Sequence, residues 1–430
     1  APLMALATNS PVSISFGGVG AAGGFILAGI VLAFFAAGFT AMSRFTKSSG
    51  AFYVYITRGL GRPMGVGASF LAVLAYNAIQ IALYAGFAVF AQGIIEHTFG
   101  ITVPWPLLII VCLVIVTILG YFNINLNANI LAVALLLEIA MMAALALSIV
   151  FHGGGPDGLT FAPVNPQNLF VPGAGAMIAF AFLSFIGFEA TVIYGEEVKN
   201  PKKSIPKATY IAVAFLALFY SFVVWAVTNG FGLDKAVQIA TDSPTEMYFL
   251  AVEQYLGGWA RGAMEILIMI SYFAVILAFH NTVARYQFAL AREGLLPSVL
   301  TRVHHKHHSP FVSSFTQSVL ALIVTVIIAL SGADPFNDFY IPVTAIGIYG
   351  ILALQVLTAL AVIFFFSKDR HGISRWRTVV SPIIGGAGLL VMLLVALYNV
   401  EILTGRQGPV NFLFTGCSFP IFIIRVVVAH

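Results

Sequence analysis

Long apolar runs separated by short polar connections dominate the pattern of hydrophobic and polar positions along this chain of 430 residues. A helix needs about 20 mostly apolar residues to cross the hydrocarbon core of a bilayer. On that criterion the pattern predicts eleven full membrane spans and one short first span, which we expect to be truncated because the chain begins at Ala1 rather than at a methionine. The expected spans are residues 1–17 (the short one), 25–42, 65–94, 105–122, 129–151, 171–195, 205–229, 261–290, 310–331, 338–367, 379–403 and 409–429.

The composition is that of a polytopic membrane protein. Hydrophobic residues make up 60% of the chain and charged residues 8%, whereas about a quarter of the residues of an ordinary soluble protein are charged. The 38 Phe and 40 Gly residues suit helices that pack closely in lipid. Because the connections are short, residues 1–430 are expected to form a single transmembrane domain. Cys112 and Cys417 lie in apolar runs and are expected to be free thiols.

The basic residues predict the orientation in the membrane. When the N-terminus is placed in the cytoplasm, seventeen of the twenty Lys and Arg residues fall on the cytoplasmic side, and only Lys235, Arg261 and Arg406 fall on the other. Because positively charged connections stay in the cytoplasm, we expect a multi-pass protein of the cytoplasmic (plasma) membrane with both termini inside. Arg261 is expected to pair with Glu265, four residues later. No basic patch interleaved with aromatic residues indicates nucleic-acid binding.

Motifs typical of enzymes and metal sites are discounted. Residues 18–23 match G-x-G-x-x-G but lie in a connection between spans with no preceding strand, so a dinucleotide site is not expected. The four histidines from His304 to His308 lie in a basic connection, which favours a solvated turn over a metal site. Without a nucleophile and base in a recognisable arrangement, the sequence predicts no enzyme, no cofactor and no metal.

One stretch, residues 180–206, combines a membrane span with polar residues. It reads FAFLSFIGFEATVIYGEEVKNPKKSIP and has Ser184, Gly187 and Glu189 within its apolar part. An acid in hydrocarbon costs roughly 2.5–3.5 kcal/mol on insertion scales, so it is expected to face other helices or a water-filled cavity. Gly187 is a poor helix former, and an interrupted helix is tolerated in a membrane only beside protein or a polar cavity. The stretch therefore predicts an interrupted span at a binding site, although Glu189 is also interpreted as a structural cap where the helix restarts.

The first span contains a second polar cluster, Thr8, Asn9 and Ser10, followed by Pro11. Pro11 lacks an N–H donor and disfavours helical geometry at Ser10, so we expect a second interrupted helix here. The alternative is that Asn9 and Ser10 only bond a neighbouring helix. Two interrupted spans at corresponding positions of two halves point to a transporter site, and here they are spans 1 and 6.

Four further polar residues within spans are candidates for function. Tyr76 and Gln80 are four residues apart on one helix face, with Asn77 beside them, so they either line a substrate site or join helices. Glu138 has no basic neighbour in its own span. It is interpreted either as a group that carries a proton or replaces a bound cation, or as a protonated carboxyl bonded to another helix.

Three segments resemble the amino acid–polyamine–organocation (APC) family of secondary transporters. Residues 185–206 (FIGFEA, then GEEVKNPKKSIP) are similar to the family's sixth helix and its cytoplasmic exit. Residues 49–62 (SGAFYVYITRGLGR) resemble its G-x-Y-x-Y segment, and residues 281–300 (NTVARYQFALAREGLLPSVL) resemble the end of its eighth helix. The resemblance implies an all-α, LeuT-like fold of twelve spans. Its inverted repeats would be residues 1–151 and 171–367, with two extra helices at 379–430.

The same resemblance implies a substrate site at the two interruptions. Backbone at Thr8–Ser10 would meet the carboxylate of an amino acid, because half-helix N-termini have a partial positive charge of about +0.5. Backbone at Ser184–Gly187 would meet the amino group, and Phe185 and Phe188 would form an aromatic gate. With the polar residues of span 3, the expected substrate-binding residues are Thr8, Asn9, Ser10, Tyr76, Asn77, Gln80, Ser184, Phe185, Ile186, Gly187 and Phe188.

Two acids are the expected coupling residues. Glu189 matches an acid that is common at this place in the family, where it is linked to proton-dependent gating. Glu138 falls near a helix-5 lysine that stands in for a sodium ion in some relatives, so a carboxylate there departs from the pattern. Thr8–Ser10 also depart from the glycine-rich signature of the family's first helix.

These features predict a secondary active transporter that moves an amino acid by alternating access, coupled to protons through Glu138 or Glu189. A polyamine or other amine carrier and an amino acid exchanger are alternatives within the same fold. A substrate-gated channel or a nutrient receptor is the alternative from another class. The expected partners are a small amino acid or amine substrate, protons and membrane lipid.

Overall fold

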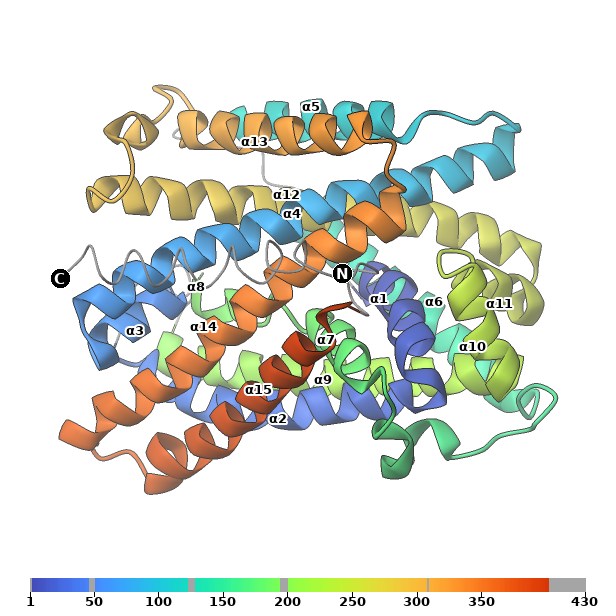
Figure 1. Cartoon of the computed structure of the whole chain (residues 1–430), viewed down its shortest axis with the longest axis horizontal. Coiled ribbons are helices and arrows are strands. Elements are labelled where there is room, and N and C mark those ends of the chain that lie inside the picture. The colour runs from blue at the N-terminus through green and yellow to red at the C-terminus, as the bar shows by residue number, and fades with distance from the viewer. Residues whose placement is uncertain (1, 46–50, 123–127, 194–199, 308, 402–430) are drawn as a thin grey trace.

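The computed structural model describes residues 2–45, 51–122, 128–193, 200–307 and 309–401, and every regular element within these ranges is a helix (Figure 1). A backbone in hydrocarbon must satisfy its own N–H and C=O groups, which a helix does. The α-helices are α1 (Pro2–Gly17), α2 (Ala21–Met42), α3 (Ala51–Leu60), α4 (Arg62–Phe99), α5 (Trp105–Tyr121), α6 (Ala128–Phe151), α7 (Ala174–Leu183), α8 (Ala190–Ile193), α9 (Pro201–Phe231), α10 (Leu233–Asp242), α11 (Met247–Leu256), α12 (Gly258–Arg292), α13 (Phe311–Leu330), α14 (Ile341–Lys368) and α15 (Ser381–Tyr398).

Eight helical stretches of the described chain are long and apolar enough to cross a membrane, and α5 and α7 are apolar but shorter. The first of the eight, Pro2–Met42, contains two expected spans, α1 and α2, joined by a 3₁₀ turn at Gly18–Gly20. Each of the first eleven expected spans therefore contains a helix. The twelfth, with Cys417, lies outside the described residues. An all-helical, multi-pass membrane protein is confirmed, whereas the count of twelve spans and the division into repeats stay predictions.

The helices surround a central pair, α1 and α7, which pack against each other (Figure 1). On one side lie α4 and α12, with α5 and α13 side by side beyond them, and on the other lie α2, α9 and α15. The short helix α3 lies at one end of the bundle, and α10 and α11 lie at the other. Arg58 in α3 and Lys235 in α10 are thus at opposite ends, in keeping with the charge bias. Which end faces the cytoplasm stays a prediction.

Small residues let α14 approach α4 closely. A Cβ atom built on Gly350 would lie 2.6 Å from the Cβ of Ala75, and one on Gly347 would overlap the side chain of Ile79. Because membrane helices associate through close van der Waals packing, these glycines fix α4 against α14.

The expected ion pair between Arg261 and Glu265 is confirmed, and it belongs to a larger cluster. The Arg261 guanidinium contacts Glu265 (3.2 Å), Glu246 (2.8 Å) and Glu253 (3.3 Å). Glu253 lies on α11 and Arg261 on α12, so the cluster holds these two helices together at one end of the bundle.

The interruption expected in span 1 is wrong, because α1 runs without a break from Pro2 to Gly17 with Pro11 inside it. A proline in a helix removes one backbone hydrogen bond. In α1 that bond would reach the Ala7 carbonyl, and contacts with neighbouring helices make such a loss tolerable in membranes. The Ser10 hydroxyl donates to the Leu6 carbonyl (2.7 Å) and bonds the Tyr248 hydroxyl of α11 (2.7 Å). The polar cluster therefore joins helices, which is the alternative that the sequence left open.

Candidate functional site

Span 6 is interrupted within the stretch that the sequence indicated. α7 ends at Leu183 and α8 begins at Ala190. Between them the backbone makes i→i+3 bonds, such as the one from the Phe185 N–H to the Phe182 carbonyl (2.9 Å). Gly187 has a φ of +113°, a region that residues with a Cβ atom rarely occupy. Glycine at this position allows the chain to turn between α7 and α8.

Glu189 closes the interruption and ties it to α4. Its Oε2 accepts a hydrogen bond from the Gly187 N–H (2.9 Å), and its Oε1 accepts one from the Tyr76 hydroxyl (2.6 Å). The residue is only 1% exposed, so both bonds are shielded from water. Glu189 therefore links the turn to α4 through both of its oxygens.

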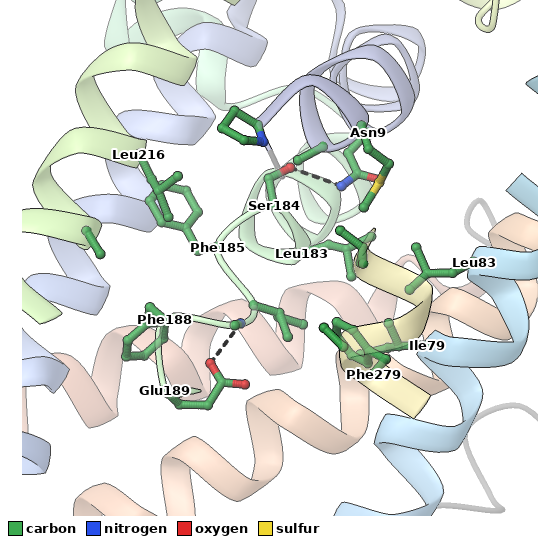
Figure 2. Close-up of a pocket in the computed structure, with 18 of the residues that line it drawn as sticks. Asn9, Ile79, Leu83, Leu183, Ser184, Phe185, Phe188, Glu189, Leu216 and Phe279 are labelled. Atoms are coloured by element: carbon green, nitrogen blue, oxygen red, sulfur yellow. Dashed lines mark hydrogen bonds between the residues drawn. The ribbon is translucent and has the colours of Figure 1, made fainter. Parts of the chain in front are cut away.

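A cavity of about 680 Å³ lies beside the interruption (Figure 2). Ligand sites typically have volumes of about 300–1,000 Å³. Its wall is built from α1, α4, α6, α9, α12 and α14 together with the residues between α7 and α8. Figure 2 shows Ile79 and Phe279 on one side of it and Leu216 on the other. Segments far apart in the sequence therefore meet around a single space of the size of a small molecule.

Asn9 joins α1 to the interruption and to the start of α14. Its Nδ2 donates to the Ser184 hydroxyl (3.1 Å), and its Oδ1 accepts from the Tyr340 hydroxyl (2.7 Å). All three residues line the cavity. Asn9 is therefore the residue of the first polar cluster that the fold brings to the cavity wall.

Eight of the thirteen residues expected at the site line this cavity. They are Asn9, Tyr76, Ser184, Phe185, Ile186, Gly187, Phe188 and Glu189.

The other five residues point elsewhere. Thr8 bonds the Tyr272 hydroxyl of α12 (2.6 Å), and Ser10 bonds the Tyr248 hydroxyl of α11 (2.7 Å). Asn77 donates to a backbone carbonyl of its own helix (2.6 Å). These side chains connect or stabilise helices in this conformation.

Gln80 belongs to a buried polar network behind the cavity wall. Its Nε2 donates to His280 Nδ1 (3.2 Å), and the His280 Nε2 bonds the Ser314 hydroxyl of α13 (2.7 Å). Gln317, also on α13, donates to Gln80 Oε1. Gln80 and Tyr76 are close to each other on α4, yet Tyr76 reaches the cavity and Gln80 faces this network.

Glu138 lies at the first turn of α1. Its Oε2 accepts from the Leu3 N–H (3.2 Å), and the next N–H, of Met4, donates to the Ser271 hydroxyl of α12 (3.2 Å). Glu138 is 3% exposed and is not among the described residues that line the cavity. Glu138 and Ser271 thus hold the start of α1 between α6 and α12.

Aromatic contacts support the interruption from behind. Phe188 packs against Phe35 and Phe39 of α2, with ring centroids 6.3 and 6.2 Å apart. Phe185 packs edge-on against Tyr220 of α9 at 6.3 Å. These contacts anchor both phenylalanines, and a role for them as a gate stays a prediction.

Tyr340 and Phe279 also line the cavity, and the sequence analysis did not predict either of them. Each is one aromatic residue in a long apolar segment. In such a segment the residues that face lipid and those that face a cavity are equally apolar, so the sequence does not distinguish them. The available signal for Tyr340 was its hydroxyl, since a buried tyrosine usually finds a hydrogen-bond partner. Among the described residues, no group of three His, Cys, Asp or Glu side chains is placed to hold a metal ion.

Comparison with known proteins gives consistent matches. A family model described as amino acid permease matches residues 3–429. The branched-chain amino acid permease BcaP of Bacillus subtilis (strain 168) is 24% identical over 394 residues, which are 87% of this chain and 79% of that protein. The methylthioribose transporter of the same organism is 24% identical over 314 residues, 69% of this chain and 65% of that protein. The Asc-type amino acid transporter 1 of Homo sapiens is 24% identical over 277 residues, 61% of this chain and 50% of that protein.

The family match covers nearly the whole chain, and the all-helical fold agrees with it. Family membership implies a LeuT-like fold. The three relatives are named for different substrates, and each is 24% identical to this chain, so the comparison does not assign a substrate to it. The chain belongs to the amino acid permease family of the APC superfamily, and it is therefore a membrane transporter and not an enzyme.

Proposed function

We propose that this protein is a secondary active transporter that moves an amino acid across the cytoplasmic membrane by alternating access. The observation that carries the proposal is the interruption between Ser184 and Glu189, which borders a cavity of about 680 Å³ inside a membrane span. Non-helical backbone at that depth is tolerated only where protein or a cavity satisfies it. Interrupted spans of this kind form the substrate sites of secondary transporters.

The amino group of an amino acid suits the end of α7 at the cavity. The C-terminal end of α7, at Leu183, has a partial negative charge of about −0.5 and favours an ammonium group. We therefore assign the substrate amino group to the end of α7. The assignment of its carboxylate to backbone at Thr8–Ser10 is not kept, because α1 is continuous there.

The amine carrier, the alternative within the same fold, is less well supported. An amine without a carboxylate would need a membrane acid as its partner. Among the described residues that line the cavity, Glu189 is the one charged side chain. Both of its carboxylate oxygens already accept hydrogen bonds, from Gly187 and Tyr76.

Proton coupling is proposed to act through Glu189. A proton on Oε2 would weaken the bond that this oxygen accepts from the Gly187 N–H, so protonation and the shape of the interruption are linked. Glu138 is the second candidate, because its bond to the Leu3 N–H links its charge to the position of α1. Buried acids of this kind form proton relays in transporters.

Counterflow of labelled amino acid into sealed proteoliposomes tests the proposed function. A carrier preloaded with unlabelled amino acid accumulates label transiently and saturates. A receptor gives no flux, and a channel gives flux without counterflow. Inhibition by putrescine but by no amino acid would favour the amine carrier and contradict the proposal.

Carboxamide variants test the coupling. Uptake should rise with an inward proton gradient in the unmodified protein and lose this dependence in Glu189→Gln, or in Glu138→Gln if that acid is responsible. An unchanged pH dependence in both variants would exclude proton coupling through these acids.

A further inference from the structure

We infer that the substrate is an amino acid with a bulky, uncharged, apolar side chain, and that an apolar wall formed by Ile79, Leu83, Val275 and Phe279 selects it. The inference rests on the proposed function and concerns the same cavity.

The wall is formed by two helices. Ile79 and Leu83 are four residues apart on α4, and Val275 and Phe279 are four apart on α12, so each pair lies on one helix face. All four line the cavity. Figure 2 shows Ile79, Leu83 and Phe279 gathered on the side opposite Leu216. They form an apolar surface that is separate from the turn between α7 and α8.

Charge excludes basic and acidic side chains from this surface. Glu189 is the single charged residue in the described lining, and its two oxygens are occupied by Tyr76 and Gly187. A lysine or arginine side chain packed against Ile79, Leu83, Val275 and Phe279 would be buried without a counter-charge on that wall, and an acidic side chain would find no base in the described lining. Burying an unpaired charge is strongly unfavourable.

Small side chains are also disfavoured because they bury little apolar surface. The amide of Asn9 is already bonded at both ends, to Ser184 and Tyr340. A small substrate would leave the apolar wall uncovered. Each buried methylene group strengthens binding about fourfold, so leucine, with three more carbon atoms than alanine, should bind on the order of 50-fold tighter.

Binding to the full chain in detergent tests the inference. Leucine, phenylalanine, alanine and lysine are compared at equal concentrations for the shift in thermal midpoint, because a ligand that binds the folded state stabilises it. Inhibition of counterflow is measured with the same four compounds. Leucine and phenylalanine should act at concentrations tens of times lower than alanine, and lysine should have no effect.

Two other outcomes would overturn the inference in different ways. If alanine or lysine binds as well as leucine, an amino acid transporter stands but the selection by an apolar wall is wrong. If none of the four binds or inhibits, the proposed function fails and this inference fails with it.

Variants locate the selective surface. Phe279→Ala should lower the ratio of leucine affinity to alanine affinity roughly tenfold. A difference of one methylene group in a hydrophobic pocket changes the discrimination between two ligands by about 10- to 200-fold. Phe273→Ala is the matched control, because Phe273 lies on the same helix and packs against the core but is outside the described lining. Val275→Ala provides a second test if Phe279→Ala does not fold. An unchanged ratio in both wall variants would overturn the assignment.

Discussion

Replacing Gly187 with alanine isolates the contribution of the backbone to the site. Gly187 has a φ of +113°, and a Cβ atom built on it would meet no atom within 4 Å. The added methyl group therefore causes no clash, and the effect of the substitution comes from the dihedral angle alone.

The expected penalty follows from that angle. A non-glycine residue in a sparsely populated backbone region costs about 1–3 kcal/mol, which corresponds to a factor of roughly 5 to 150 in the population of the native turn. If the turn relaxes, the apparent Kd for substrate rises by this factor, because only the native fraction binds. If the surrounding helices hold the turn in place, the free energy of unfolding falls by the same 1–3 kcal/mol.

The assay measures both quantities in detergent, the substrate Kd by titration and the thermal midpoint without ligand. Gly262→Ala is the control, because Gly262 lies in α12 and its added Cβ would also meet nothing within 4 Å, but its φ is not in the left-handed region. Alanine at that helical position should stabilise by about 0.5–1 kcal/mol. A Gly187→Ala protein with the affinity and midpoint of the unmodified protein would refute the reasoning.

Three further predictions concern single contacts. Tyr76→Phe removes the hydrogen bond that Glu189 accepts from the Tyr76 hydroxyl. Because a hydrogen bond to a charged group is worth about 1.5–3 kcal/mol, counterflow should slow roughly tenfold or more. Strictly additive effects of Tyr76→Phe and Glu189→Gln in a double-mutant cycle would contradict direct coupling between the two residues. Asn9→Ala leaves the buried hydroxyls of Ser184 and Tyr340 without their amide partner and should lower the free energy of unfolding by about 1–3 kcal/mol. A thermal midpoint equal to that of the unmodified protein would contradict a stabilising role for these two hydrogen bonds. Arg261→Gln leaves the buried Glu265 without its arginine and should lower the free energy of unfolding by about 2 kcal/mol, less than for a fully buried pair because Glu246 and Glu253 reach solvent. Arg261→Lys keeps the charge and should lower the free energy of unfolding by a smaller amount. Equal losses in the two variants would show that the charge is unimportant.

The interruption at Gly187 and Glu189 was predictable from the sequence because its cause is local. A glycine, a serine and an acid within six residues of a membrane span are unfavourable in a plain helix, whatever surrounds them. The spans were predictable for a similar reason, since their length and composition meet the demands of the bilayer directly.

The continuity of α1 and the position of Gln80 were not predictable, because both depend on contacts with distant residues. The proline in α1 indicates a break, but α1 stays continuous because it is buried among other helices, which Thr8 and Ser10 bond through Tyr272 and Tyr248. Gln80 and Tyr76 are equally polar positions on α4, and only the packed helices decide which faces the cavity. A sequence identifies the polar group in a span but does not identify its partner.

The hydrogen bonds among Gln80, His280 and Gln317 restrict how the transporter changes shape. Together with the bond from the Thr117 hydroxyl of α5 to Ser318 of α13 (2.6 Å), they link α4, α5, α12 and α13. Separating these helices would leave the amide groups of Gln80 and Gln317 without hydrogen-bond partners in hydrocarbon, where no water replaces them. We therefore expect these four helices to stay together as one rigid group during transport, and α1 and the α7–α8 turn to move against them.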